Sequence, residues 1–124
     1  DGNILPHAMP IPAPTLAEWT GVFDGILCNA VWMHLARSVR PEAWRQVRAL
    51  LKPGGRLWML VSEDRPGLDG QRRDSFGRRY EALRVDELVD EARSEGFHLE
   101  YRSSELDLPE TNGCGWRRLK WIKP

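Results

Sequence analysis

Residues 23–62 decide the fold of this chain: FDGILCNAVWMHLARSVRPEAWRQVRALLKPGGRLWMLVS. The run Val22–Val31 is mostly apolar, which is typical of a strand buried on both faces of a parallel sheet. After Pro41, which the first turn of a helix tolerates, apolar residues recur at helical spacing. Residues 53–55, PGG, end that helix, and a second apolar run covers Leu57–Val61. This order predicts a right-handed crossover between two parallel strands.

The rest of the chain divides into an arm and a continuation of the same α/β pattern. Residues 1–21 carry several prolines and predict an extended arm followed by a short helix, whereas residues 22–124 form one unit. Within that unit, residues 63–79 are polar and glycine-containing, and they predict a mobile loop. A helix is expected between Arg84 and Gly96, and strands are expected at residues 97–102 and 116–122. The core stripe expected for that helix is Val85, Leu88, Val89 and Ala92.

Composition narrows the classes of function. Lys plus Arg and Asp plus Glu number 18 each, so net charge gives no reason to expect nucleic acid or an anionic membrane as partner. No apolar stretch approaches the roughly 20 residues of a membrane span, and no secretory signal opens the chain. The two cysteines, Cys28 and Cys114, form neither a disulfide framework nor a metal motif. We therefore expect a cytoplasmic protein.

Two motifs carry a family resemblance. FDGILCNAVWMHL at residues 23–35, followed by LLKPGGRLWMLV at residues 50–61, resembles class I S-adenosylmethionine-dependent methyltransferases, and EARSEGF at residues 91–97 resembles that family's last helix and the start of the next strand. The resemblance covers about residues 22–122 and implies the C-terminal half of the domain. The implied fold is α/β, a partial, three-layer Rossmann-like sheet of about four strands in the family order 4-5-7-6, with flanking helices. The implied activity is methyl transfer from S-adenosylmethionine to a small molecule.

The resemblance also implies site residues. Asn29, Ala30 and Trp32 would line the cofactor, because they follow the FD strand and ligands in open α/β sheets bind beyond the carboxyl ends of strands. His34 would lie near the substrate and act as the catalytic residue. Asp1 would contact the adenine.

Each of these residues also has a purely structural interpretation. His34 is either a general base or a packed histidine at a helix start, and Trp32 either stacks on a flat ligand or belongs to the core. Asn29 either contacts a ligand or satisfies local backbone groups. Arg79 and Tyr80 follow the predicted loop, which in the family covers the substrate. The arginine pairs at residues 72–73 and 78–79 are either solvated or bind an acid or a phosphate.

One part of the family pattern has no counterpart. The Gly-rich turn that opens a helix and approaches the cofactor closely is not found in this sequence, and residues 54–55 do not replace it because they precede a strand. We therefore expect the isolated chain to bind S-adenosylmethionine weakly or not at all. The strand Phe23–Asn29 would then have an open edge, which predicts a homodimer, a complementing polypeptide, or coverage by the arm. The alternative function is a non-catalytic α/β module for protein association.

Overall fold

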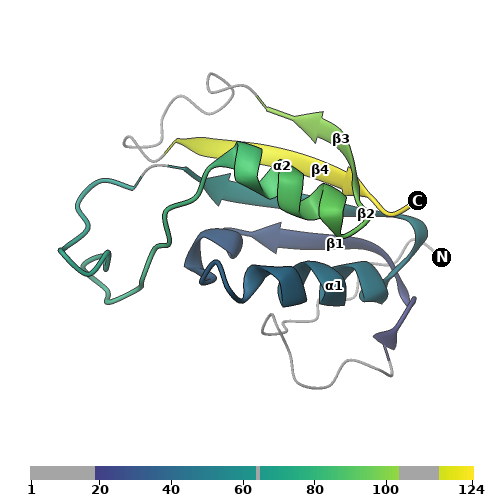
Figure 1. The fold of residues 1–124 in the computed structure, drawn as a ribbon, viewed down its shortest axis with the longest axis horizontal. Helices are drawn as coiled ribbons and strands as arrows, with labels where there is room; N and C mark the ends of the chain where they lie inside the picture. The colour runs from purple at the N-terminus through teal and green to yellow at the C-terminus, as the bar shows by residue number, and fades with distance from the viewer. Residues whose placement is uncertain (1–18, 64, 104–114) are drawn as a thin grey trace.

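The computed structural model describes residues 19–63, 65–103 and 115–124, which form one sheet with helices (Figure 1). In chain order the elements are β1 (Phe23–Asn29), the 3-10 turn η2 (Trp32–His34), α1 (Arg40–Leu50), β2 (Leu51–Ser62), α2 (Val85–Ser94), β3 (His98–Arg102) and β4 (Trp116–Ile122). The order across the sheet is β1-β2-β4-β3. β1 and β2 are parallel, and β4 is antiparallel to both of its neighbours. The predicted α/β class and the strand order 4-5-7-6 are confirmed.

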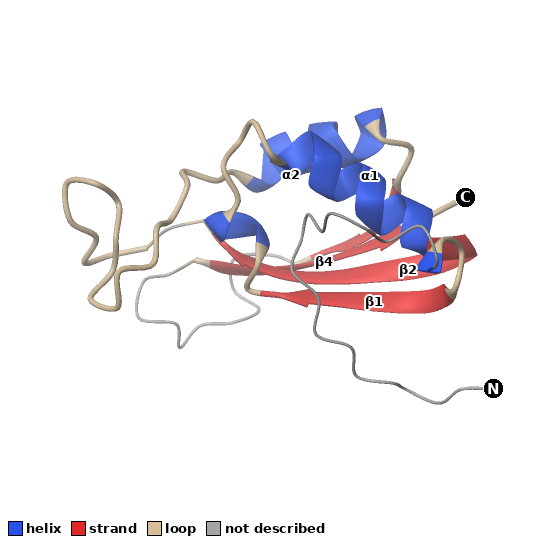
Figure 2. Cartoon of the chain, turned by 90° about the horizontal axis from the view of Figure 1, so that it is seen from below, coloured by secondary structure: helices blue, strands red, loops and turns tan. Residues whose placement is uncertain are grey.

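Both helices cover the same face of the sheet (Figure 2). The connection from β1 through α1 to β2 and the connection from β2 through α2 to β3 move across the sheet in the same direction. Since both join parallel strands, the same right-handed crossover brings both helices to one side. The described residues therefore form two layers, and the prediction of three layers is wrong for them. No helix among these residues has the length and apolar character needed to cross a bilayer.

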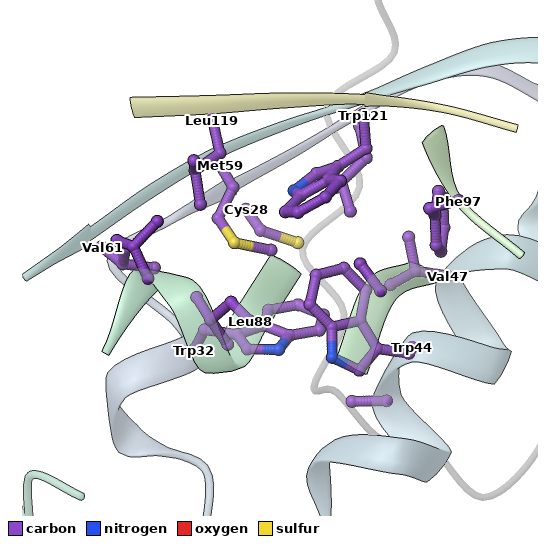
Figure 3. Close-up of a cluster of buried hydrophobic side chains, with 14 of the residues drawn as sticks. Cys28, Trp32, Trp44, Val47, Met59, Val61, Leu88, Phe97, Leu119 and Trp121 are labelled. Carbon is purple, nitrogen blue, oxygen red and sulfur yellow. The ribbon is translucent and has the colours of Figure 1, made fainter. Parts of the chain in front are cut away.

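The core lies between that face and the two helices (Figure 3). Trp44 of α1 is its centre: the ring centroid of Trp32 lies 4.7 Å away and that of Trp121 lies 5.5 Å away. All three indoles are fully buried. Burial of an aromatic side chain stabilises a domain by a few kcal/mol, so this cluster contributes much of the stability that links α1 to the sheet.

The opposite face of the sheet is uncovered within the described part of the chain. Leu27 of β1 is 71% exposed, and Trp58 of β2 is 43% exposed. The expectation that the first strand is buried on both faces is therefore wrong here. The residues of β1 that point away from the helices, such as Leu27, are exposed because no described element covers that face of the sheet.

The start of α1 is as predicted, but its C-terminal end is not. Pro41 lies in the first turn of α1, as predicted, but β2 begins at Leu51, directly after the helix, and residues 53–55 lie inside the strand. The Lys123 ammonium donates to the carbonyls of Arg48 and Leu51 at 2.8 Å each, so a distant residue satisfies the end of α1. Burial, with the Arg48 charge, holds the pKa of Lys123 below its usual value.

A buried polar cluster joins α1 to α2. Arg40 is fully buried, and its Nη2 lies 2.8 Å from one carboxylate oxygen of Glu91, while Trp44 Nε1 donates to the other oxygen at 3.1 Å. Nε and Nη1 of Arg40 have no partner among the described residues. Glu91 therefore compensates a buried charge that is only partly hydrogen-bonded.

Candidate functional site

The carboxyl ends of the two parallel strands define the candidate site. Asn29 ends β1 opposite Leu60 of β2, and its side chain is exposed. The N–H of the next residue, Ala30, donates to the Leu60 carbonyl at 2.9 Å, and Ala30 then adopts a φ of 58°. A left-handed conformation costs a residue with a Cβ roughly 1–2 kcal/mol, so packing holds this sharp turn in place. Asn29 and the Ala30 backbone are thereby held at the sheet edge where ligands bind in open α/β folds.

Trp32 lies behind this edge rather than on it. Its indole is fully buried against Trp44 in the core, and Nε1 has no hydrogen-bond partner among the described residues. The apolar character of η2 explains the position, since Met33 is buried beside it. Only the backbone of Trp32 is left to line a ligand site. Asp1, the other predicted cofactor contact, lies outside the described residues.

The structure brings His34, Arg79 and Tyr80 together. The His34 Nδ1 lies 2.9 Å from the Arg79 carbonyl, and the imidazole packs at 4.5 Å against the Tyr80 ring. A carbonyl only accepts, so Nδ1 carries the proton and Nε2 of the neutral ring keeps a lone pair. No carboxylate hydrogen-bonds to this imidazole among the described residues. The group can therefore accept a proton at Nε2, with its orientation fixed by a backbone carbonyl.

The loop before Tyr80 is organised by two carboxylates. Asp74 accepts from the backbone N–H groups of Phe76 and Arg78, from the Arg78 guanidinium at 2.8 Å and from the Tyr80 hydroxyl at 3.4 Å. Burial raises the pKa of Asp74, but the hydrogen bonds and charge of Arg78 and the Phe76 N–H outweigh it and hold the pKa below its usual value. Asp69 receives the N–H groups of residues 71 and 73, which lower its pKa. The described residues of the predicted loop, 63 and 65–79, contain no helix or strand, as predicted. The spacing of Asp74 and Gly77 is the turn signal that would have located its anchor.

Glu63, directly after β2, supports this edge of the sheet. One of its carboxylate oxygens accepts the Val85 N–H at 2.8 Å, which caps α2, and the other lies 2.9 Å from Arg117 Nη1. Arg84, the residue at the N-cap position, makes no side-chain cap, since a guanidinium has no acceptor for the N–H groups of the first turn. The sequence contains no local sign of this long-range cap.

Among the described residues, no three His, Cys, Asp or Glu side chains are grouped as metal ligands. Cys28 is buried in the core, and desolvation raises the pKa of its thiol to about 12. A thiol in that state is neither a nucleophile nor a ligand at neutral pH.

Solved structures resemble the whole described fold. The 1,6-didemethyltoxoflavin-N1-methyltransferase of Burkholderia thailandensis matches with a TM-score of 0.66 and 23% identity, over 84% of this chain and 45% of its own. A SAM-dependent methyltransferase of Methanosarcina mazei matches with a TM-score of 0.64 and 18% identity, over 88% and 63% respectively.

This chain has part of the S-adenosylmethionine-dependent methyltransferase fold. It spans roughly half the length of the structures it matches. No protein-family model matches the sequence, and no curated protein does. The [4+2]-cyclase SpnF also matches, with a TM-score of 0.59, 18% identity, and coverage of 93% of this chain and 53% of its own. The fold therefore fixes the architecture and not the reaction.

Proposed function

We propose that this chain is part of an S-adenosylmethionine-dependent methyltransferase that acts on a small-molecule acceptor. The strand order β1-β2-β4-β3, with one antiparallel strand inserted before the last, is the observation that carries the proposal. That order is the one that the methyltransferase resemblance predicts, and ligands of open α/β sheets bind beyond the carboxyl ends of the parallel strands.

The residues at this edge have distinct tasks in the proposal. Asn29 and the backbone of Ala30 hold one side of the cofactor, which supplies an electrophilic methyl group when it is bound. His34 accepts the proton released by the acceptor at Nε2, because Nδ1 is engaged with the Arg79 carbonyl. Arg79 and Tyr80 border the acceptor. Most of the rate enhancement would come from positioning the acceptor, which requires no strongly perturbed group.

The same proposal predicts weak cofactor binding by these 124 residues alone. A close approach to the cofactor requires backbone N–H groups of a Gly-rich turn, and this sequence contains none that opens a helix. Isothermal titration of the chain with S-adenosylmethionine is expected to show no binding near micromolar concentrations. Mixing the chain with a polypeptide that carries such a turn, from the same protein, is expected to restore binding. An Asn29→Ala chain in that mixture should bind less tightly, whereas a Glu42→Ala chain should match the original.

Two results would contradict the proposal. Tight one-to-one binding of S-adenosylmethionine by the monomeric chain would show that no further polypeptide is needed to complete the cofactor site. Absence of binding in every completed form would remove the methyltransferase assignment itself.

A second candidate is protein association, and the open side of the sheet supports it. The paired positions Leu27, Trp58, Lys120 and Tyr101 form one row across the uncovered face, and the three apolar members are between 43% and 71% exposed. β1 is also an edge strand of the described sheet. Exposed apolar patches and open strand edges are typical of interaction surfaces. One solved neighbour is a complex between the Trm112 methyltransferase activator of Haloferax volcanii and a putative methyltransferase.

The association proposal specifies a homodimer or a complementing polypeptide at the β1 edge. The Ala30 N–H points toward β2, where it donates to the Leu60 carbonyl. Successive backbone N–H groups of a strand point to opposite sides, so the N–H of Leu27, three residues earlier, points toward the open edge. Leu27→Pro should therefore abolish dimers in sedimentation velocity without removing a bond to β2, whereas Leu27→Val should keep them. A strict monomer at high concentration for the unmodified chain would rule out the homodimer.

A further inference from the structure

A hollow beyond the carboxyl end of β2 gathers three arginines that are far apart in the sequence. Its volume is about 470 Å³, and Arg65, Arg72 and Arg84 line it together with Glu63. Pro66 and Leu83 supply apolar wall. The lining arginines come from the start of the loop, its middle and the N-cap position of α2. Sequence spacing gives no sign that they meet.

The acidic group in this hollow is already neutralised. Both oxygens of Glu63 are engaged, one by the Val85 N–H and the other by Arg117. Arg65 pairs with Asp74 at 4.0 Å, which leaves Arg72 and Arg84 as the lining cations that have no carboxylate partner among the described residues. The described lining therefore has a surplus of positive charge.

Two of the guanidinium groups have donors available for a ligand. Arg72 Nε donates to the Tyr80 carbonyl at 2.7 Å, but its terminal nitrogens have no hydrogen bond among the described residues. The Arg84 side chain has no hydrogen bond or ion pair with any of those residues. Guanidinium groups match the geometry of carboxylates and phosphates, often through two parallel hydrogen bonds. The charges of Arg72 and Arg84 also repel each other, and a bound anion would relieve that repulsion.

The hollow adjoins the candidate site through direct contacts. The Arg65 guanidinium lies 5.0 Å from the centre of the Tyr80 ring, and that ring packs at 4.5 Å against His34. The Glu81 N–H, one residue further, donates to the Met33 carbonyl at 2.8 Å and ties the loop to η2. A molecule anchored by the arginines would therefore reach toward the imidazole.

We propose that this hollow binds the oxyanion group, a carboxylate or a phosphate, of the methyl acceptor. The assignment of the ligand as an acceptor rests on the proposed function, whereas the anion site itself rests on the arginines. The acceptor class is therefore an acidic small molecule, with its anionic end held by Arg72 and Arg84 and its reacting end toward His34.

The test is a titration of the 124-residue chain with inorganic phosphate, and separately with acetate, at constant ionic strength. Backbone amide signals of residues 82–85 are followed by NMR. We expect a saturable shift in the millimolar range, and the tighter of the two anions identifies the headgroup. Arg84→Gln should weaken binding at least tenfold. Arg93→Gln is the matched control, since it removes an exposed arginine from the other end of the same helix.

Three results would overturn the site. These are shifts that do not saturate, equal shifts across the whole chain, or an Arg84→Gln chain that binds as the original does. The measurement needs no S-adenosylmethionine. Phosphate binding without cofactor binding in any completed form would keep the anion site and reject the methyltransferase. Cofactor binding in a completed form without anion binding would keep the methyltransferase assignment and reject the anion site.

Discussion

Replacing Glu63 tests how one carboxylate secures the edge of the sheet. Glu63→Ala removes the cap of Val85, which costs about 1 kcal/mol, and leaves Arg117 without its carboxylate. The two side chains are only 13% and 9% exposed, so the lost charged hydrogen bond costs about 2 kcal/mol more. We expect a total loss of about 3 kcal/mol in the free energy of unfolding. Glu63→Gln keeps an acceptor for the cap and should lose about 2 kcal/mol.

Urea unfolding followed by tryptophan fluorescence measures both losses. With an m-value of about 1.5 kcal/mol/M, the Ala variant should unfold about 2 M earlier than the original chain. Glu81→Ala is the control, because its partner Arg79 is half exposed and 3.6 Å away, and it should change stability by less than about 0.5 kcal/mol. If Glu63→Ala is no more costly than Glu81→Ala, the link between β2, α2 and Arg117 is not a source of stability. If the Glu63→Ala variant does not fold, the stability of Glu63→Gln can still be compared with that of Glu81→Ala.

Three further predictions concern the core and the open face. In a chain whose other cysteine is replaced by serine, the buried Cys28 thiol should react with a thiol reagent only after unfolding. Because its pKa is raised from 9.0 to about 12, the unfolded state loses the thiol proton before the folded state does, and the free energy of unfolding should fall as pH rises from 9 toward 12. Cys28→Ala should remove this contribution to the pH dependence. Gly25→Ala should displace the half-exposed Trp58 ring, because the added Cβ would lie 2.8 Å from it, and near-ultraviolet circular dichroism should change at a cost of about 1 kcal/mol. Glu91→Ala should cost about 3 kcal/mol in urea unfolding, and Arg40→Met combined with it should recover most of that loss; no recovery would show that the buried charge is not the cause.

Local patterns were sufficient for the elements and their order. The apolar run Val22–Val31 contains the strand Phe23–Asn29, and the strand Trp116–Ile122 has the predicted bounds. α2 ends before Gly96, whose φ is 89°. Glycine is favoured there because a φ of 89° is a left-handed conformation that other residues rarely adopt, whereas the Arg48 side chain that an added Cβ would meet at 2.8 Å could move aside. Pro41 lies in the first turn of α1, as expected. These signals are encoded within a few residues, so the sequence reveals them.

The candidate site was only partly predictable. His34, Arg79 and Tyr80 were proposed separately, and the structure shows that they touch. Trp32 lies in the core because η2 turns its apolar face inward, and helical or strand spacing does not predict the direction of such a short turn. Glu63 is only the first residue of a predicted polar loop in the sequence, and its partner Arg117 is 54 residues away.

By itself the sequence determined two parallel strands joined by a helix, a second helix, two more strands and a neutral overall charge, because each depends on nearby residues or on composition. Tertiary structure alone decided that both helices cover one face, that Leu27 and Trp58 lie on the other, and that Arg65, Arg72 and Arg84 meet in one hollow. These features depend on the handedness of the crossovers and on contacts between distant segments. Local patterns cannot encode such contacts, since each partner is chosen by packing after the chain has folded.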